Sequence, residues 1–142
     1  MADSRWAEYV GKEMPPGKPL TLSADVIKKF AESVGDTRPD YLSGAVALPA
    51  FANHVFVKSL GGGIAAMKGL IKNPMMVLHT GETYEYLAPV KAGDTLTTGG
   101  KIKSVEEKNN MLWVAMESWA KNQEGKEAIR AVMTLGVRAG GY

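Results

Sequence analysis

Residues 111–121 read MLWVAMESWAK, and this stretch decides the fold. Apolar side chains stand at nearly every position, so an extended chain here would be apolar on both of its faces. A strand of that kind is typical of the centre of a sheet, because a strand with one wet face alternates apolar and polar residues. We therefore predict a central strand that is covered on one side by a buried helix.

Three further segments around this stretch are predicted to be strands. They lie at 76–86, 95–105 and 128–138. Short polar connections at 107–110 and 122–126 join the last three strands of the chain, and connections of this kind form antiparallel hairpins. The second half of the sequence therefore predicts a mostly antiparallel sheet.

Two helices are predicted before these strands. Ser23 is a suitable N-cap for an amphipathic helix over 24–34, which Gly35 would end. A second and more apolar helix is predicted over 50–68, with three glycines at 61–63 in its middle. Because three glycines cost about 3 kcal/mol of helix propensity relative to alanine, this helix must be buried or must break at them.

The chain of 142 residues is predicted to form one domain of the α+β class. Residues 1–19 are expected to be an irregular segment, followed by a short strand at 20–22, and residues 35–49 are expected to be a loop. The helices would lie on one face of the sheet.

The composition excludes several classes of function. The chain has no cysteine, and therefore no disulfide, thiol nucleophile or thiolate metal site. Two histidines alone make no recognisable metal motif. A net charge of +2 without basic runs argues against nucleic acid. No apolar run is long enough to cross a membrane, and residues 1–6 lack the apolar core of a signal peptide, so we expect a cytoplasmic protein.

Two segments carry a resemblance to a known family. Residues 30–41 read FAESVGDTRPDY, and residues 78–96 read LHTGETYEYLAPVKAGDTL. Over about 20–138, the chain resembles the MaoC-like dehydratase and (R)-specific enoyl-thioester hydratase group, which has the hotdog fold. The resemblance implies a single hotdog, in which a curved antiparallel sheet wraps around a central buried helix.

In the catalytic members of this group the loop motif is Asp-x-Asn-Pro-x-His, whose Asp and His handle a water molecule. Asp36 and Pro39 match it, whereas Arg38 replaces the Asn and Tyr41 replaces the His. A phenol with a pKa of about 10 is a poor base at neutral pH, although it can donate a hydrogen bond. The resemblance thus implies that Asp36 orients water, with Tyr41 or His54 as its proton partner.

The resemblance also implies where a thioester would bind. Backbone N–H groups near Ala50 to Asn53 would polarise the thioester carbonyl, and the substrate-binding residues would be Ala50, Phe51, Asn53 and His79. Either His54 or His79 could replace the missing base; alternatively, each is a histidine satisfied by local backbone or by solvent.

Three functions follow from the resemblance. The first is a hydratase or dehydratase (a lyase of fatty-acid metabolism) acting on 2-enoyl or 3-hydroxyacyl thioesters of coenzyme A or acyl carrier protein, with no further cofactor and no metal. The second is a non-catalytic acyl-binding subunit that pairs with a catalytic hotdog partner. This chain resembles the non-catalytic members in that Tyr41 replaces the histidine of the catalytic motif. The third is an acyl thioesterase, against which the loop at 35–41 argues. We expect a homodimer, or a heterodimer with another hotdog subunit, and neither nucleic acid nor a membrane as partner.

Overall fold

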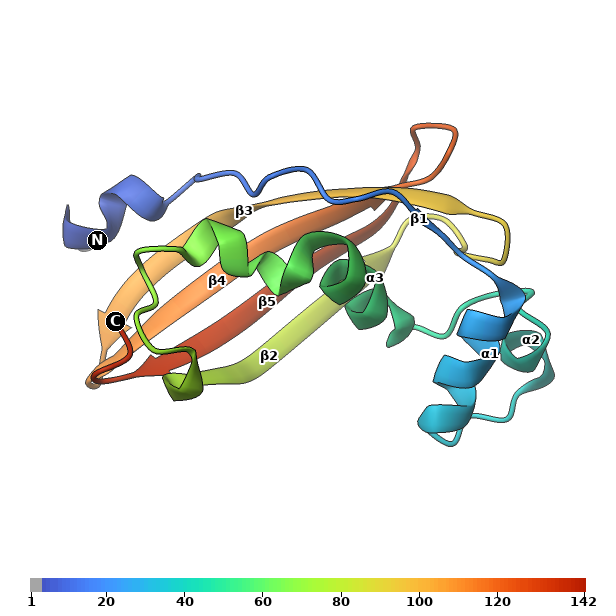
Figure 1. Ribbon diagram of the computed structural model, residues 1–142, viewed down its shortest axis with the longest axis horizontal. Helices are drawn as coiled ribbons and strands as arrows, with labels where there is room; N and C mark the ends of the chain where they lie inside the picture. The colour runs from blue at the N-terminus through green and yellow to red at the C-terminus, as the bar shows by residue number, and fades with distance from the viewer. Residues whose placement is uncertain (1–3) are drawn as a thin grey trace.

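The computed structural model describes residues 4–142, apart from the burial of Gly62 and the side chain of Ile64. Within this range five strands form one antiparallel sheet in the order β1-β3-β4-β5-β2 (Figure 1). The strands are β1 (Leu20–Thr21), β2 (Val77–Tyr86), β3 (Thr95–Lys108), β4 (Met111–Lys121) and β5 (Glu127–Arg138). The predicted central strand is confirmed, because β4 is the middle strand of the sheet.

The pleat of β4 explains its composition. Its even-numbered residues from Leu112 to Ala120 are buried and its odd-numbered residues from Met111 to Trp119 are half-buried, so neither face is fully exposed to water. A two-residue turn joins β3 to β4, and both of its residues, Asn109 and Asn110, have positive φ (55° and 59°). Asparagine tolerates this left-handed conformation, which matches the twist of a tight hairpin.

The two edges of the sheet differ. The N-terminal segment, which contains the 3₁₀ helix η1 (Ser4–Tyr9), runs along the outer edge of β3: the N–H groups of Gly11 and Met14 each donate to a β3 carbonyl at 2.8 Å. This segment was predicted to be irregular over 1–19, of which residues 1–3 lie outside the described part. The opposite edge, β2, has no second strand beside it among the described residues.

Helix α1 (Ala24–Ser33) confirms the amphipathic helix predicted at 24–34. The Ser23 side chain accepts a hydrogen bond from the backbone N–H of Val26 at 3.2 Å, as an N-cap does. Gly35 follows the helix with φ +74°, a conformation that ends helices. The loop predicted over 35–49 needs a correction, because it contains the short helix α2 (Pro39–Leu42), whose first residue is a proline.

The second predicted helix is shorter than expected. Helix α3 (Phe51–Leu60) ends at Gly61, which has φ +62°, and the chain continues as the 3₁₀ helix η2 (Gly61–Met67). The prediction of one helix over 50–68 is therefore wrong, and its alternative, a break at the glycines, is what the structure has. A further 3₁₀ turn, η3 (Pro74–Met76), leads into β2.

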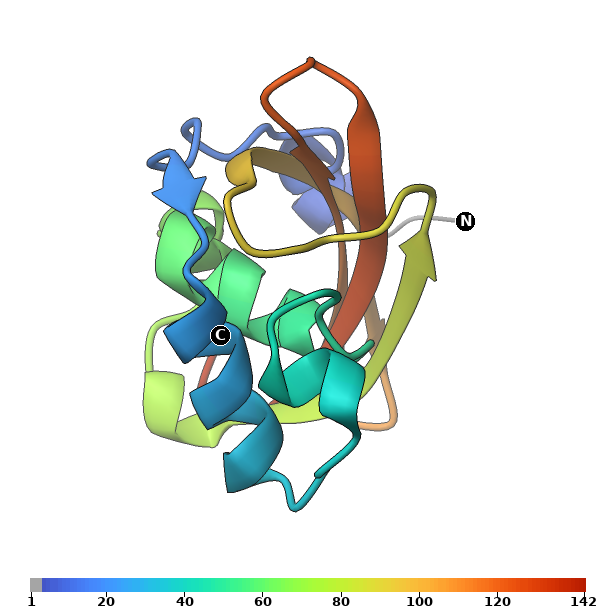
Figure 2. The same ribbon diagram turned by 90° about the vertical axis from the view of Figure 1, so that its right-hand side faces the viewer.

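Helix α3 lies across the concave face of the curved sheet (Figure 1). Helices α1 and α2 lie beyond the end of the sheet at which α3 begins (Figures 1 and 2). The residue Phe51 is fully buried, and its ring meets that of Phe30 of α1 edge to face at 5.4 Å. This arrangement is the hotdog fold that the resemblance implied. Within residues 4–142, no helix is long and apolar enough to span a lipid bilayer.

Candidate functional site

The loop after α1 holds Asp36 in a tight ion pair. The Arg38 guanidinium donates to the two carboxylate oxygens from Nε (3.0 Å) and Nη2 (2.6 Å), and the Arg38 backbone N–H donates to Oδ1 at 3.2 Å. The Asp36 side chain is only 17% exposed. Hydrogen bonding to the Arg38 side chain lowers the pKa of Asp36, so this carboxylate is a weaker base than an ordinary aspartate.

Tyr41 contacts the arginine of this ion pair through its ring. The guanidinium carbon of Arg38 lies 4.7 Å from the centre of the Tyr41 ring, a cation–π contact. Tyr41 also lines a cavity of about 420 Å³, together with Tyr86 and residues of the segments 46–49 and 87–90. In that cavity the Tyr86 hydroxyl donates to the Pro49 carbonyl at 2.7 Å, and burial raises the pKa of Tyr86 to about 12. The Tyr86 hydroxyl is therefore protonated at neutral pH.

The N-terminus of α3 already uses the N–H groups that were predicted to polarise a thioester. The Phe51 N–H donates to Leu48 O at 2.9 Å, and the Asn53 N–H donates to Ala50 O at 3.2 Å. Ala50 itself is exposed, and it provides no side-chain cap. A ligand carbonyl would have to compete with these internal hydrogen bonds.

His54 lies among aromatic rings. Its imidazole stacks on the Phe51 ring at 5.0 Å and meets the Phe30 ring at 6.1 Å. Burial, and then the positive charge of Lys58, lower the pKa of His54. His54 is therefore a neutral imidazole at pH 7, placed apart from the large cavity described next.

A larger and mostly apolar cavity of about 650 Å³ lies between α3–η2 and the strands β2 and β5. Its wall consists of Asn53, Val57, Ala65, Met67, Lys68, Ile71, Pro74, Val77, His79, Met133 and Leu135. Two of the predicted substrate-binding residues, Asn53 and His79, are in this wall, whereas Asp36, Tyr41 and His54 are not. A cavity of this volume and character can enclose an aliphatic chain.

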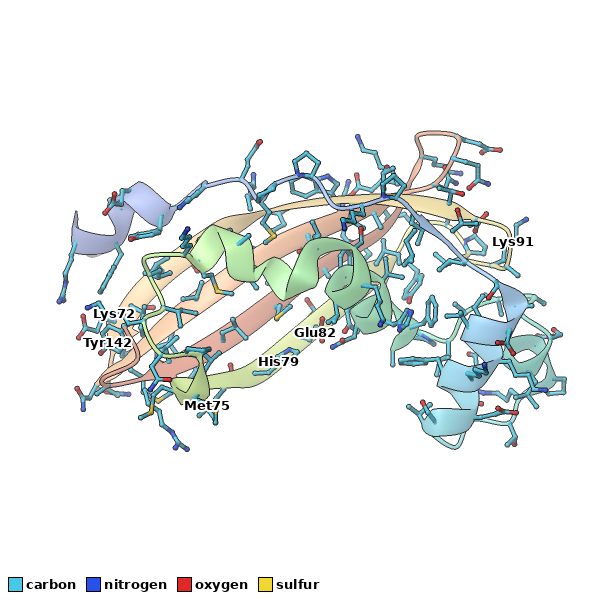
Figure 3. The ribbon with its side chains drawn as sticks, viewed as in Figure 1. Lys72, Met75, His79, Glu82, Lys91 and Tyr142 are labelled. Carbon is cyan, nitrogen blue, oxygen red and sulfur yellow. The ribbon has the colours of Figure 1, made fainter. Side chains whose placement is uncertain are left out.

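The polar end of the larger cavity is organised by Glu82, which the sequence did not single out. Its Oε2 accepts a hydrogen bond from Asn53 Nδ2 at 3.2 Å and lies 3.4 Å from His79 Nε2. The Glu82 side chain is 13% exposed, and its Oε1 is buried without a hydrogen-bond partner in the described part of the chain. Figure 3 shows Glu82 and His79 on the same strand, beneath the helical layer.

A β-bulge brings His79 and Glu82 together. Residues three apart on a regular strand point to opposite faces, but the pairing of β2 with β5 shifts register between His79 and Gly81. Thr80 is the extra residue, and its hydroxyl donates to the Thr134 carbonyl at 3.0 Å. Before the bulge His79 lines the cavity opposite Leu135, and after it Glu82 lies on the same face of the sheet opposite Met133. Bulges next to functional sites commonly re-aim a side chain in this way.

Tyr84 lies beside this polar cluster. It follows Glu82 on the inward face of β2 and lies beside both Glu82 and Asn53. Burial raises the pKa of Tyr84, and the neighbouring Glu82 raises it further. The phenol of Tyr84 therefore stays protonated at neutral pH.

The structure thus separates the predicted site residues into three groups. Asp36 and Tyr41 meet through Arg38, His54 stacks on Phe51, and Asn53 and His79 meet through Glu82. Only the last group lines the large apolar cavity.

Comparison with known proteins agrees with the fold. The family described as the FAS1-like dehydratase domain region matches residues 8–131. A UPF0336 protein of Streptomyces avermitilis is 26% identical over 92% of this chain and 93% of its own.

Two solved structures of lower identity share the fold. A chain of the C-terminally truncated HadBC (3R-hydroxyacyl-ACP dehydratase) complex of Mycobacterium tuberculosis aligns with a TM-score of 0.72 at 18% identity, covering 90% of this chain and 96% of its own. The (R)-hydratase of A. caviae involved in PHA biosynthesis aligns with a TM-score of 0.65 at 16% identity, covering 92% of this chain and 96% of its own.

Proposed function

This chain belongs to the FAS1-like dehydratase domain family, and on that premise we propose that it is the acyl-binding subunit of a hydratase or dehydratase for 2-enoyl and 3-hydroxyacyl thioesters. Its large cavity holds the acyl chain, and a second hotdog chain supplies the acid and base. Coenzyme A or acyl carrier protein carries the thioester, and no other cofactor takes part.

The observation that carries this proposal is the apolar cavity of about 650 Å³ with a polar end at Asn53 and His79. Methylene groups gain about 0.8 kcal/mol each on leaving water, so a chain of several carbons binds there by burial alone. The polar end is the natural place for the oxygen-bearing end of the acyl group.

The loop at 35–41 favours a subunit that does not perform the chemistry alone. Asp36 would have to accept a proton or orient water, yet Arg38 occupies both of its carboxylate oxygens. Tyr41 stands where catalytic members have a histidine, and its ring is covered by the same guanidinium. A complete acid–base pair at this loop is therefore expected on a partner chain.

The free edge of β2 supports such a partner. It extends over ten residues, and Leu78 on it is 38% exposed. An uncovered strand edge is a template for pairing with another strand. The structurally similar HadBC chain comes from a complex, and pairing at β2 would give this chain a comparable partner.

The proposal is tested by measuring binding and turnover separately. We expect octanoyl-CoA to bind the purified chain in calorimetry, and the chain alone to leave crotonyl-CoA unhydrated, as followed by the enoyl absorbance. Adding a second hotdog chain with a complete Asp-x-Asn-Pro-x-His motif should give turnover. Absence of octanoyl-CoA binding would overturn the proposal.

A hydratase that acts alone is the second candidate, and the pairing of Glu82 with His79, which lines the cavity, favours it. Hydration of crotonyl-CoA by the chain alone would establish this function and remove the need for a partner. Release of free coenzyme A in the same assay would instead indicate a thioesterase.

A further inference from the structure

We propose that the N-terminal segment of residues 4–18, the strap, is an autoinhibitory contact that stops this chain from pairing with a second copy through the β3 edge. Apart from the two residues of β1, β3 is an edge strand of the sheet, as β2 is on the opposite side. The strap therefore decides which of the two edges is open to partners. This inference is independent of the acyl cavity and of the activity proposed for it.

Without the strap, β3 would be a long and open template for another strand. It extends over 14 residues, and β1 pairs with two of them, Thr95 and Leu96. The unpaired N–H and C=O groups of such an edge form hydrogen bonds with any other strand edge that reaches them. In a solution of this chain, the strand edges that can reach β3 are those of other copies.

The strap occupies this edge with main-chain hydrogen bonds. Three of its N–H groups donate to β3 carbonyls at 2.8, 2.8 and 3.1 Å, and one β3 N–H donates back to the strap at 3.0 Å. These hydrogen bonds run from Gly11 to Ile102, from Met14 to Gly100, from Gly17 to Thr98, and from Ile102 to Lys12. The strap thus already satisfies the groups of β3 that a strand of another copy would need.

Two residues of the strap anchor it to the body of the molecule. The side chain of Met14 is buried, and it fills the space beside Gly63 and Gly100, where a Cβ would lie 3.1 and 3.0 Å from it. Gly17 lies so close to β3 that a Cβ there would collide with Thr98 Oγ1. Both anchors belong to the strap, so each can be changed without altering β3 itself.

The strap is itself a poor template for a further strand. Pro15 and Pro16 have no backbone N–H, and the strap N–H groups listed above point to β3. Lys12, Glu13 and Lys18 place exposed charges along it. Prolines and charges are the means by which native edges avoid pairing. Docking of the strap therefore replaces an edge that can pair with one that cannot.

The test uses the full chain carrying Leu78→Lys, which weakens association through β2. Gly17→Val or Met14→Asp is added to this background to lift the strap. A valine does not fit at position 17, and an aspartate at position 14 would be buried without a partner. Val10→Asp is the matched control, because Val10 lies on the strap but its side chain is exposed.

Amide hydrogen exchange reports whether the strap is docked, and light scattering over a range of concentrations measures association. In Gly17→Val and Met14→Asp we expect the amides of Gly11 and Ile102 to lose protection, while those of β4 and β5 keep it. The association constant should rise about tenfold or more, since one net hydrogen bond has a value of this order and several become available. Val10→Asp should change neither quantity.

A synthetic peptide of residues 4–18 provides a second arm of the test. Added to the associated Gly17→Val variant, the wild-type peptide should occupy the open β3 edge and dissociate the copies. The same peptide carrying Gly17→Val should leave them associated, because it cannot dock beside Thr98.

Lost protection of the strap amides without a rise in association overturns the inference, as does association that the wild-type peptide does not reverse. Strap amides that stay protected in both variants overturn the anchoring by Met14 and Gly17 and the inference with it. Loss of protection throughout β4 and β5 in both variants would show that folding requires the strap, so that it is not a contact that opens; this result also overturns the inference.

Discussion

Arg38 determines what Asp36 can contribute. The sequence identified Arg38 as the replacement for the Asn of the catalytic motif, but not as the partner of the carboxylate two residues before it. The turn at Pro39 and the stacking of the guanidinium on Tyr41 bring the long side chain back onto Asp36. That direction depends on rotamers and on the turn, which residue identities alone do not specify.

A first prediction concerns this pair at low pH. Because the pKa of Asp36 is lower in the folded chain than its usual value, the pair stabilises the fold above the ordinary aspartate range and loses this effect as the pH falls through the lowered pKa. Urea unfolding of the wild-type chain and Arg38→Gln should therefore differ most at neutral pH and converge in acid. A difference that does not change with pH would contradict the assignment.

Glu82 is a second residue whose orientation could not be predicted from the sequence. A glutamate three residues after a histidine on a strand would ordinarily face the opposite side of the sheet. The interruption is visible only in the structure, where Val77 and His79 line the cavity at odd positions whereas Glu82 and Tyr84 are half-buried at even ones. This change requires an extra residue between them.

At the scale of elements, the bulge in β2 depends on Thr80. Its hydroxyl donates to the carbonyl of Thr134 at the point where the register of β2 and β5 shifts. We predict that Thr80→Val lowers the free energy of unfolding by about 1 kcal/mol. Thr83→Val, at an exposed position on the same strand, should have little effect. Equal effects in chemical denaturation would argue against this role of Thr80.

The glycines after α3 provide a further prediction. Gly61 and Gly63 both have positive φ, but a Cβ on Gly61 would meet nothing within 4 Å, whereas on Gly63 it would lie 2.8 Å from Met116 Sδ. Gly61→Ala should cost about 1–2 kcal/mol from backbone strain alone. Gly63→Ala should cost about 1 kcal/mol more, because the buried Met116 side chain must also shift. Thermal unfolding compares the stabilities of the two variants. Equal losses of stability would contradict the expected clash of the new Cβ with Met116.

Most elements were predictable because their signals are local. The apolar pattern of β4, the Ser23 cap of α1 and the asparagine turn at 109–110 each identify an element within a few residues of sequence. The length of α3 was not predictable, because three glycines allow either a buried helix or a break. The choice depends on contacts such as that of Gly63 with Met116, which lies on a distant strand.

At the scale of the whole molecule, the two sheet edges suggest how the chain assembles. The N-terminal segment covers β3, and β2 remains available. We predict that Leu78→Lys weakens association, with a second copy or with another hotdog chain, about tenfold or more. Val10→Lys changes a similarly exposed residue (42%) away from this edge and should leave association unchanged. Light scattering on each purified variant, alone and mixed with another hotdog chain, measures the association.

The fold class and the antiparallel hairpins of the last three strands could be anticipated from the sequence, whereas the cavity could not. Its wall combines α3 and η2 with β2 and β5, and residues such as Met67 and Met133 meet there only after the sheet has curved around the helix. No motif marks such a wall, because any apolar side chain of suitable size can belong to it.

The bulge at Thr80 has a consequence for how this site can change over evolutionary time. Removing one codon at this position would exchange the faces of the strand segment before Gly81, and so would turn His79 away from Glu82 while leaving both residues in the gene. A single nucleotide substitution that merely replaces Thr80 does not alter this alternation. We therefore expect insertions and deletions within this strand, rather than substitutions alone, to separate relatives that keep the polar end of the cavity from those that have lost it.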